Sequence, residues 1–145
     1  MTDETPDVET CGVAELTPDV DEPLSVGQAA ELIGLSTHTL RWYERMGLLE
    51  DVARNRSGRR QYTRTDLKRL VMPMRLRATG MPVSEMQRYV ELLRAGADTE
   101  SQRMQLLEAH RERVLSHIAD LHSDLDVINS KIAMYRRSLS PAPPA

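Results

Sequence analysis

The fold of this 145-residue chain is decided by the stretch Leu35-Ser36-Thr37-His38-Thr39-Leu40-Arg41-Trp42-Tyr43-Glu44-Arg45-Met46-Gly47-Leu48-Leu49. Ser36 can cap a helix from Thr37 to Met46, because its hydroxyl can accept from a free amide of the first turn. Helical spacing turns Leu40 and Tyr43 toward a core. On or near the opposite face, the same spacing places four polar or aromatic residues: His38, Arg41, Trp42 and Arg45.

A second short helix precedes this one. Ser25 and Gln28 form the pattern of a capping box, and Leu24 can complete it as a hydrophobic staple. Gly34 is placed to end this helix just before Ser36 begins the next. Two short helices joined by so tight a turn predict a helix-turn-helix, whose second helix fits the major groove of DNA.

The basic segment that follows is Arg54-Asn55-Arg56-Ser57-Gly58-Arg59-Arg60-Gln61-Tyr62. It holds four arginines, with a turn expected at Ser57-Gly58, so we expect a short hairpin that serves as a wing. Its arginines can pair with phosphates or enter a minor groove. The alternative is a small helical domain whose arginines are only solvated.

Two more helices are expected after the wing. Thr63 and Asp66 can cap a helix that reaches Thr79 and stops at Gly80, and a further helix follows Pro82. Pro73 lies inside the first of them, where it should remove one backbone hydrogen bond and kink the axis.

Charge is distributed unevenly behind the net value of −3. Residues 1–22 hold eight acidic residues and no Lys or Arg, residues 23–80 have a net charge of +6, and residues 81–145 of −1. We interpret the first segment as a disordered, solubilising tail; a sharper hypothesis is that it competes with DNA for the basic middle. Deleting residues 1–22 tests that hypothesis, since an unchanged DNA affinity at low salt would end it.

The stretch quoted first, together with Gly58-Arg59-Arg60-Gln61-Tyr62 and Asp66-Leu67, resembles the N-terminal domain of the MerR-type transcription regulators. The resemblance covers residues 24–93. It implies a winged helix-turn-helix that binds a near-palindromic promoter site as a dimer, and a mechanism that distorts an overlong promoter spacer for RNA polymerase. Two departures are Trp42, where the family usually has a smaller aromatic residue, and Pro73.

By position, the resemblance implies DNA contacts from Arg41 and Trp42 in the recognition helix and from Arg60 and Tyr62 in the wing. A half-buried core position is the alternative for Trp42. The full set of candidate DNA-binding residues is Ser36, His38, Thr39, Arg41, Trp42, Arg45, Arg54, Arg56, Arg59, Arg60 and Tyr62.

Residues 99–139 contain neither Gly nor Pro and predict one helix that is too long to bury its apolar stripe against a small domain. Apolar residues alternate at spacings of three and four, as in a coiled coil, so we expect a homodimer. Arg111 interrupts the stripe and should fix register. The candidate dimerisation residues are Leu107, Arg111, Val114, Ile118, Leu121, Leu125, Ile128, Ile132 and Tyr135. The family resemblance implies antiparallel pairing.

We expect no metal site and no cofactor. Three histidines lie along the long helix at coil-flanking positions, where surface roles are usual, and the single cysteine, Cys11, lies in the acidic tail. The segment from Gly96 to Tyr135 is most similar to the NmlR- and AdhR-like branch of the family, which responds to aldehydes and electrophiles. Members of that branch often carry a cysteine in the helix after the wing, and residues 64–79 contain none.

The sequence thus predicts a mainly α protein, with a winged helix-turn-helix head followed by a long dimerising coiled-coil helix. The expected parts are an acidic tail (1–22), the DNA-binding domain (23–94), the dimerisation helix (99–139) and a loose end (140–145), with no appended drug-binding domain. We expect a cytoplasmic, nucleoid-associated regulator without a membrane partner, since no apolar run is long enough to span a bilayer.

Three other functions remain open. One is a repressor or architectural protein that binds DNA without an effector, and another is a coiled-coil adaptor whose basic head binds an acidic protein. An enzyme is disfavoured, because no His, Asp, Ser and Cys residues converge in the predicted fold.

Overall fold

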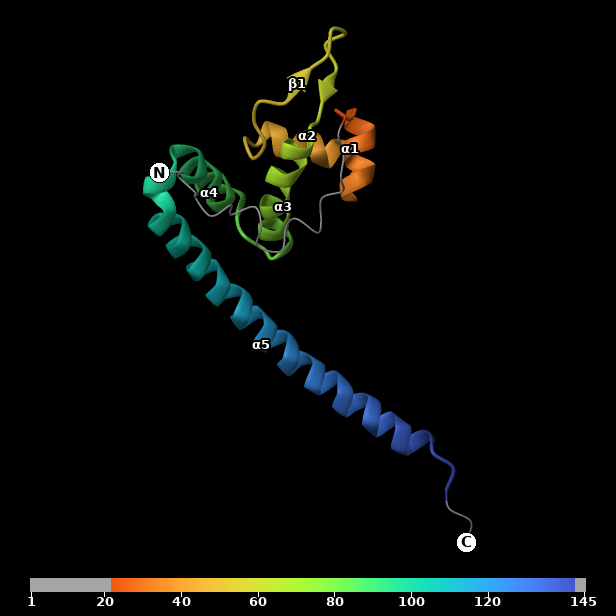
Figure 1. Cartoon of the computed structure of the whole chain (residues 1–145). Helices are drawn as coiled ribbons and strands as arrows, with labels where there is room; N and C mark the ends of the chain where they lie inside the picture. Colours follow the sequence, from red (N-terminus) through yellow and green to blue (C-terminus); the bar gives the residue numbers. More distant parts are fainter. Residues whose placement is uncertain (1–21, 143–145) are drawn as a thin grey trace. The chain divides into compact units, whose positions relative to one another are not determined.

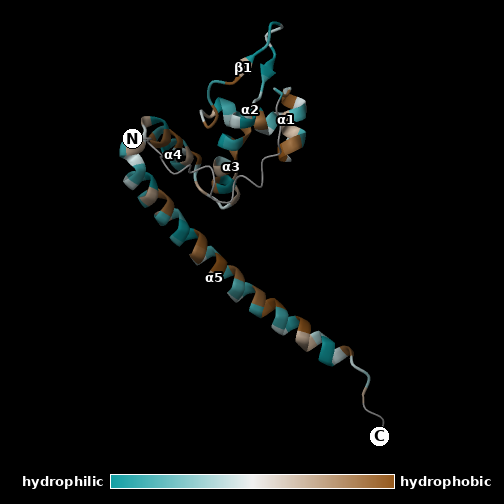
Figure 2. Cartoon of the chain, in the orientation of Figure 1, coloured by the Kyte–Doolittle hydropathy of each residue, from teal (hydrophilic) through white to brown (hydrophobic). Residues whose placement is uncertain are grey.

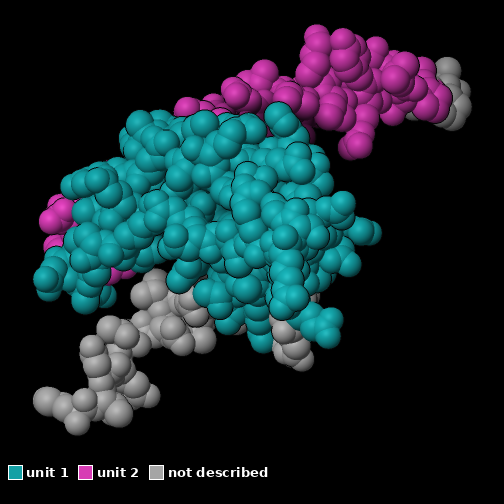
Figure 3. Space-filling view, turned by 90° about the horizontal axis from the view of Figure 1, so that it is seen from above, with its two compact units in different colours: residues 1–100 teal, residues 101–145 magenta. Residues whose placement is uncertain are grey.

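The computed structural model describes residues 22–142. The predicted acidic tail, with Cys11, and the end of the chain therefore lie largely outside the described residues. The chain divides into two compact units, residues 1–100 and 101–145 (Figure 3). The predicted fold class is confirmed: the chain is mainly helical, with a small two-stranded hairpin (Figure 1).

The first two helices are α1 (Val26–Ile33) and α2 (Thr37–Arg45), which pack against each other. Ser25 and Gln28 exchange the two hydrogen bonds of a capping box, at 3.0 and 3.2 Å. Gly34 ends α1 at φ 74°, a left-handed conformation that glycine adopts without a Cβ clash. Ser36 then caps α2 by accepting from the amide of Thr39 at 3.0 Å. The helix-turn-helix therefore follows from these local residues.

A hairpin follows α2. Strands β1 (Ala53–Arg54) and β2 (Arg60–Gln61) pair antiparallel. Just after β2, Tyr62 forms a bridge with Leu24, through amide-to-carbonyl distances of 2.8 and 2.9 Å. This bridge joins the hairpin to the segment before α1.

Two longer helices complete the first unit, α3 (Arg64–Ala78) and α4 (Val83–Ala95), which pack together. Thr63 and Asp66 form the predicted capping box. The α3 helix continues through the buried Pro73. Apolar side chains from these elements and the segments between them form a core without phenylalanine, made of Ala29, Ala30, Leu40, Tyr43, Leu48, Leu49, Tyr62, Leu67, Leu70, Val71, Leu76, Met81, Met86, Tyr89, Val90 and Leu92.

A short 3-10 helix, η3 (Ala97–Thr99), precedes α5 (Glu100–Leu139). The α5 helix has 40 residues, which corresponds to a length of about 60 Å. Hydrophobic segments recur along α5 among hydrophilic ones, as the brown bands in Figure 2 show.

Candidate nucleic-acid interface

The α2 helix has one buried face and one exposed face. Leu40 and Tyr43 are buried, as predicted. His38, Arg41 and Arg45, which follow one another at helical spacing, are exposed. Ser36 is exposed at the N-terminal end and Thr39 is half-buried beside it, where their hydroxyls are 2.9 Å apart. The exposed face thus presents two guanidinium groups, an imidazole and hydroxyl groups, all of which can bond to phosphates or base edges.

The turn between β1 and β2 is held by a side chain. The Oδ1 atom of Asn55 accepts from the amides of Ser57 and Arg59, each at 3.0 Å. Arg54 folds back on the turn, where its Nη1 donates to the carbonyl of Gly58 at 2.8 Å. Arg56 and Arg59 are exposed. The turn therefore has its own internal support, and Arg54 is exposed as well, although it also donates within the turn.

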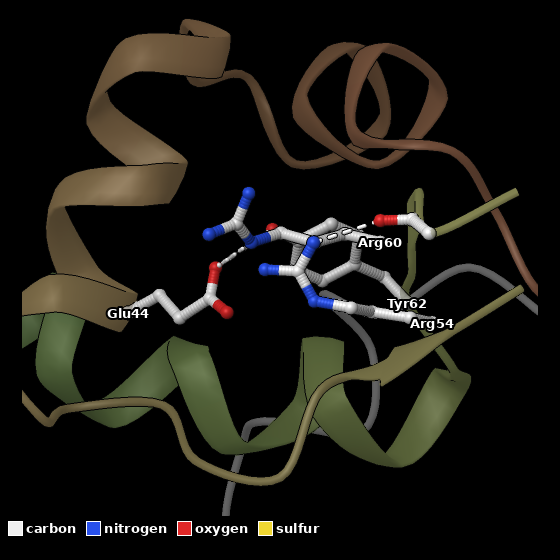
Figure 4. A network of polar contacts seen from close by, with 5 residues as sticks. Glu44, Arg54, Arg60 and Tyr62 are labelled. Carbon is white, nitrogen blue, oxygen red and sulfur yellow. Dashed lines mark hydrogen bonds and ion pairs between the residues drawn. The ribbon is translucent and has the colours of Figure 1, made fainter.

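Glu44 connects α2 to this hairpin (Figure 4). Its Oε2 lies 2.6 Å from Nε of Arg60 and accepts from the hydroxyl of Tyr62 at 3.4 Å. The side chains of Arg60 and Glu44 are 30% and 22% exposed, so the ion pair is partly shielded from water. An Arg–Glu pair of this kind neutralises both charges and links the two elements that carry the exposed arginines.

Tyr62 differs from the exposed candidate residues in its burial. Its side chain is wholly buried, because the bridge between its backbone and Leu24 places the ring in the core. This burial does not favour the DNA contact implied for Tyr62, which stays a prediction. Burial, assisted by the charge of Glu44, raises the pKa of Tyr62 to about 12, and the nearby charges of Arg60 and Arg41 oppose that rise.

Trp42 is half-buried, and its ring is covered by a cation from α3. The guanidinium carbon of Arg77 lies 4.2 Å from the centre of the Trp42 ring and 5.6 Å from that of Tyr43. The two rings meet edge to face at 5.1 Å. Contacts of this kind are stabilising. Trp42 therefore packs between α2 and α3, which agrees with the alternative considered for it above.

Two side chains of α4 bind the chain just after α2. Nε2 of Gln87 donates to the carbonyl of Met46 at 2.9 Å, and Nη2 of Arg94 donates to that of Gly47 at 2.7 Å. Arg94 also pairs with Glu50 at 2.6 Å. These bonds satisfy carbonyl groups at the C-terminal end of α2, which a helix leaves without partners of its own.

Sequence reasoning did not identify Glu44, Arg77, Gln87 or Arg94. Only Glu44 could have been singled out from the sequence, because it is the one acidic residue between Glu31 and Glu50. The partners of the other three are remote in sequence, and nothing in the local pattern indicates them.

The second unit presents an exposed apolar stripe along α5. Leu107 and Val114 are half-buried, and Arg111 is exposed beside Glu112, 3.7 Å away. The exposed large apolar residues of α5 are Met104, Leu115, Ile118, Leu121, Leu125, Val127, Ile128, Ile132, Met134, Tyr135 and Leu139. They include most of the predicted heptad positions. An exposed apolar surface of this size on one helix is typical of a site of association.

Within the part of the chain that the structure describes, no group of three or more His, Cys, Asp or Glu side chains is placed to hold a metal ion. A separate finding concerns membranes: none of the helices in residues 22–142 has the length and apolar character needed to cross one.

Comparison with known proteins places this geometry in a family. Residues 24–93 match the family described as MerR HTH family regulatory protein, and residues 67–131 match MerR, DNA binding. An uncharacterised HTH-type transcriptional regulator of Haemophilus influenzae is 37% identical over 114 residues, covering 79% of this chain and 84% of that protein.

Solved structures that resemble this chain belong to the same family. The crystal structure of HiNmlR, a MerR family regulator lacking the sensor domain and bound to promoter DNA, is 36% identical with a TM-score of 0.72, covering 80% of this chain and 92% of that one. A MerR family transcriptional regulator from Bacillus thuringiensis is 31% identical with a TM-score of 0.69, covering 78% and 99%. On its sequence, its fold and these relatives, the chain belongs to the MerR family of HTH-type regulators.

Proposed function

We propose that the protein is a transcription regulator that binds double-stranded promoter DNA through α2 and the hairpin wing. One observation carries the proposal: the exposed arginines of α2 and of the wing lie on two elements that Glu44 and Arg60 join directly. A helix with exposed basic and hydroxyl side chains beside a basic hairpin is a typical duplex-binding surface. The related HiNmlR was crystallised on promoter DNA, which supports the same role here.

The proposed docking places α2 in the major groove. Ser36, His38 and Thr39 are at its N-terminal end, the part of a recognition helix that meets base edges. Arg41 and Arg45 follow on the exposed face, within reach of guanine edges or phosphates. On the wing, Arg56 and Arg59 are the best placed for phosphates, because Arg54 and Arg60 are engaged within the protein.

We further propose a homodimer formed by antiparallel pairing of α5. If each residue i lies opposite residue 239 − i of the second chain, every heptad position meets another heptad position. The central layer then pairs Ile118 with Leu121. The next two layers pair Val114 with Leu125 and Arg111 with Ile128. This register buries the exposed stripe, with one DNA-binding head at each end of the coil.

A two-fold dimer implies a near-palindromic site, because the symmetry of the protein is mirrored in the DNA. As a family-derived proposal, the dimer activates transcription by distorting a promoter spacer so that RNA polymerase engages both promoter elements. Contact energy then offsets a DNA deformation that costs a few kcal/mol. Action at promoters also implies an intracellular, nucleoid-associated protein. Nothing in this mechanism requires a cofactor or enzymatic activity.

Two experiments test these proposals. Random duplexes are incubated with the full-length chain at physiological salt, and the bound fraction is sequenced; enrichment of a near-palindrome supports DNA recognition, whereas no enrichment favours the coiled-coil adaptor. Transcription in vitro from an enriched site, with and without the protein, then separates an activator from an effector-independent repressor by the sign of the change.

A further inference from the structure

Glu44 is an acidic residue in the middle of a basic surface. Arg41 and Arg45, its neighbours on α2, are both exposed, and Glu44 is the one acidic residue between Glu31 and Glu50. A carboxylate close to DNA phosphates repels them, so an acidic residue lowers DNA affinity wherever it faces the duplex. We therefore expect Glu44 to have a structural role that compensates for this loss of DNA affinity.

The contacts of Glu44 indicate what that role is. Its Oε2 lies 2.6 Å from Nε of Arg60, and it accepts from the hydroxyl of the buried Tyr62 at 3.4 Å. These contacts run from α2 to the returning strand of the hairpin, between residues 16 and 18 positions apart. In Figure 4 the carboxylate of Glu44 extends from the helix toward the Arg60 side chain.

The hairpin needs such support. Each of its strands has two residues, and a hairpin so short is not stable by itself. Two of its attachments to the head are the backbone bridge between Tyr62 and Leu24 and the side-chain contacts of Glu44. The bridge fixes the base of the hairpin. The Glu44–Arg60 pair fixes the returning strand against the recognition helix.

We propose that Glu44 is a positioning residue that holds the wing at a fixed angle to the recognition helix, which favours one duplex sequence at the expense of general attraction to DNA. This inference rests on the proposed function above. When the carboxylate is removed, Arg60 regains a free positive charge, and attraction to any duplex increases. At the same time the wing loses its fixed position, so a duplex selected for fit to both elements binds less well.

Two duplexes and three proteins test the proposal. The probes are the duplex that the full-length wild-type chain enriches from a random pool and a shuffled duplex of the same composition. The proteins are wild type, Glu44→Gln and Glu31→Gln. Glu31 is exposed on α1, so its replacement removes the same charge without touching the wing. Dissociation constants are measured for every combination.

The expected result is a change of opposite sign on the two probes. Glu44→Gln should weaken binding to the enriched duplex about tenfold, within the range measured for coupled residues. It should strengthen binding to the shuffled duplex about twofold, through the added net charge. Glu31→Gln should leave the ratio of the two affinities at the wild-type value. An unchanged ratio in Glu44→Gln overturns the proposal.

Amide hydrogen exchange separates positioning from a loss of folding. In Glu44→Gln, exchange should become faster at the Asn55 and Tyr62 amides, which pair with Arg59 and Leu24, while α3 amides exchange as in wild type. Wing amides that exchange at the wild-type rate would overturn the proposal even if selectivity fell. A wild-type chain that enriches no duplex would overturn the proposed function itself, and this inference with it.

Discussion

At the scale of single residues, the four wing arginines are not equivalent. Arg56 and Arg59 are exposed, Arg54 donates to Gly58, and Arg60 pairs with Glu44 at 2.6 Å. An arginine whose charge is already neutralised within the protein displaces fewer counterions from DNA than an exposed one. The position of a guanidinium group along the wing therefore determines what it contributes to binding.

This difference predicts the salt dependence of two variants. Arg56→Ala should reduce the slope of log affinity against log salt by about one, as expected for one lost phosphate contact. Arg60→Ala should reduce it by clearly less, because Glu44 already neutralises that charge. Arg88→Ala, on α4 and paired with Glu91, is the control and should leave the slope unchanged. Equal reductions for Arg56 and Arg60 would contradict this assignment.

Tyr62 predicts a dependence of stability on alkaline pH. Its pKa is raised to about 12, whereas an unfolded tyrosine titrates near 10. Between those values the folded chain keeps a proton that the unfolded chain loses, so the free energy of unfolding falls as pH rises.

Chemical denaturation from pH 8 to 11.5 checks this in wild type and in Tyr62→Phe. The phenylalanine variant should lose stability less steeply above pH 10, and the two curves should run parallel below pH 9. Identical slopes above pH 10 would mean that Tyr62 titrates normally in the folded chain.

At the scale of elements, the turn between α1 and α2 requires a left-handed backbone conformation at Gly34. Gly34 adopts φ 74°, and a Cβ built on it would meet no atom within 4 Å. Gly34→Ala should therefore lower the free energy of unfolding by about 1 kcal/mol, purely through the left-handed conformation.

Gly27, which lies inside α1, gives a control of opposite sign. A Cβ there meets only Oγ of Ser25, at 4.0 Å, so Gly27→Ala should raise stability by roughly 0.5–1 kcal/mol through helix propensity. Thermal unfolding of both variants provides the check. Destabilisation by both would show that the helix-turn-helix packs differently from this structure.

The proposed pairing of α5 gives a prediction about distance. The variant Cys11→Ser with Gln102→Cys would carry one spin label per chain near the start of α5. In the antiparallel register proposed above, residue 102 lies opposite residue 137, so the two labels should be about 50 Å apart. Parallel helices would bring the two labels within about 20 Å. That distance is the spacing between two packed helices plus the lengths of the two label side chains. A label at residue 120 serves as the control. The labels on the two chains should lie near each other there, whether the helices pair antiparallel or parallel.

The elements could be predicted because their signals are local. Caps at Ser25, Ser36 and Thr63 act within three residues, and the 3.6-residue period of α2 identified Leu40 and Tyr43 as buried. The burial of side chains in the wing was harder to predict. Its strands have two residues each, too few for alternation to show which side chains face inward.

The features of the site that the sequence does not predict depend on long-range pairing. Tyr62 is buried because of a bridge to Leu24, and Glu44 acquires its role from Arg60, 16 residues away. Gln87 and Arg94 bind carbonyls that lie 41 and 47 residues earlier. Contacts of this kind leave no periodic or spacing signal. They appear only when the helices are packed.

At the scale of the whole molecule, the net charge of −3 conceals a functional division. Residues 23–80 carry a net charge of +6, and these residues include α2 and the wing. The exposed apolar stripe lies on α5, in the other unit. In the proposed function, DNA attraction and self-association therefore belong to different parts of the chain.

We propose that two copies of this chain bind one near-palindromic duplex through α2 and the wing. The most direct test of this proposal is to select duplexes from a random pool and to determine the mass of the complex on the enriched duplex by analytical ultracentrifugation. We expect an enriched sequence with two-fold symmetry and a complex of two chains per duplex. No enriched sequence, or a single chain bound to an asymmetric site, would contradict it.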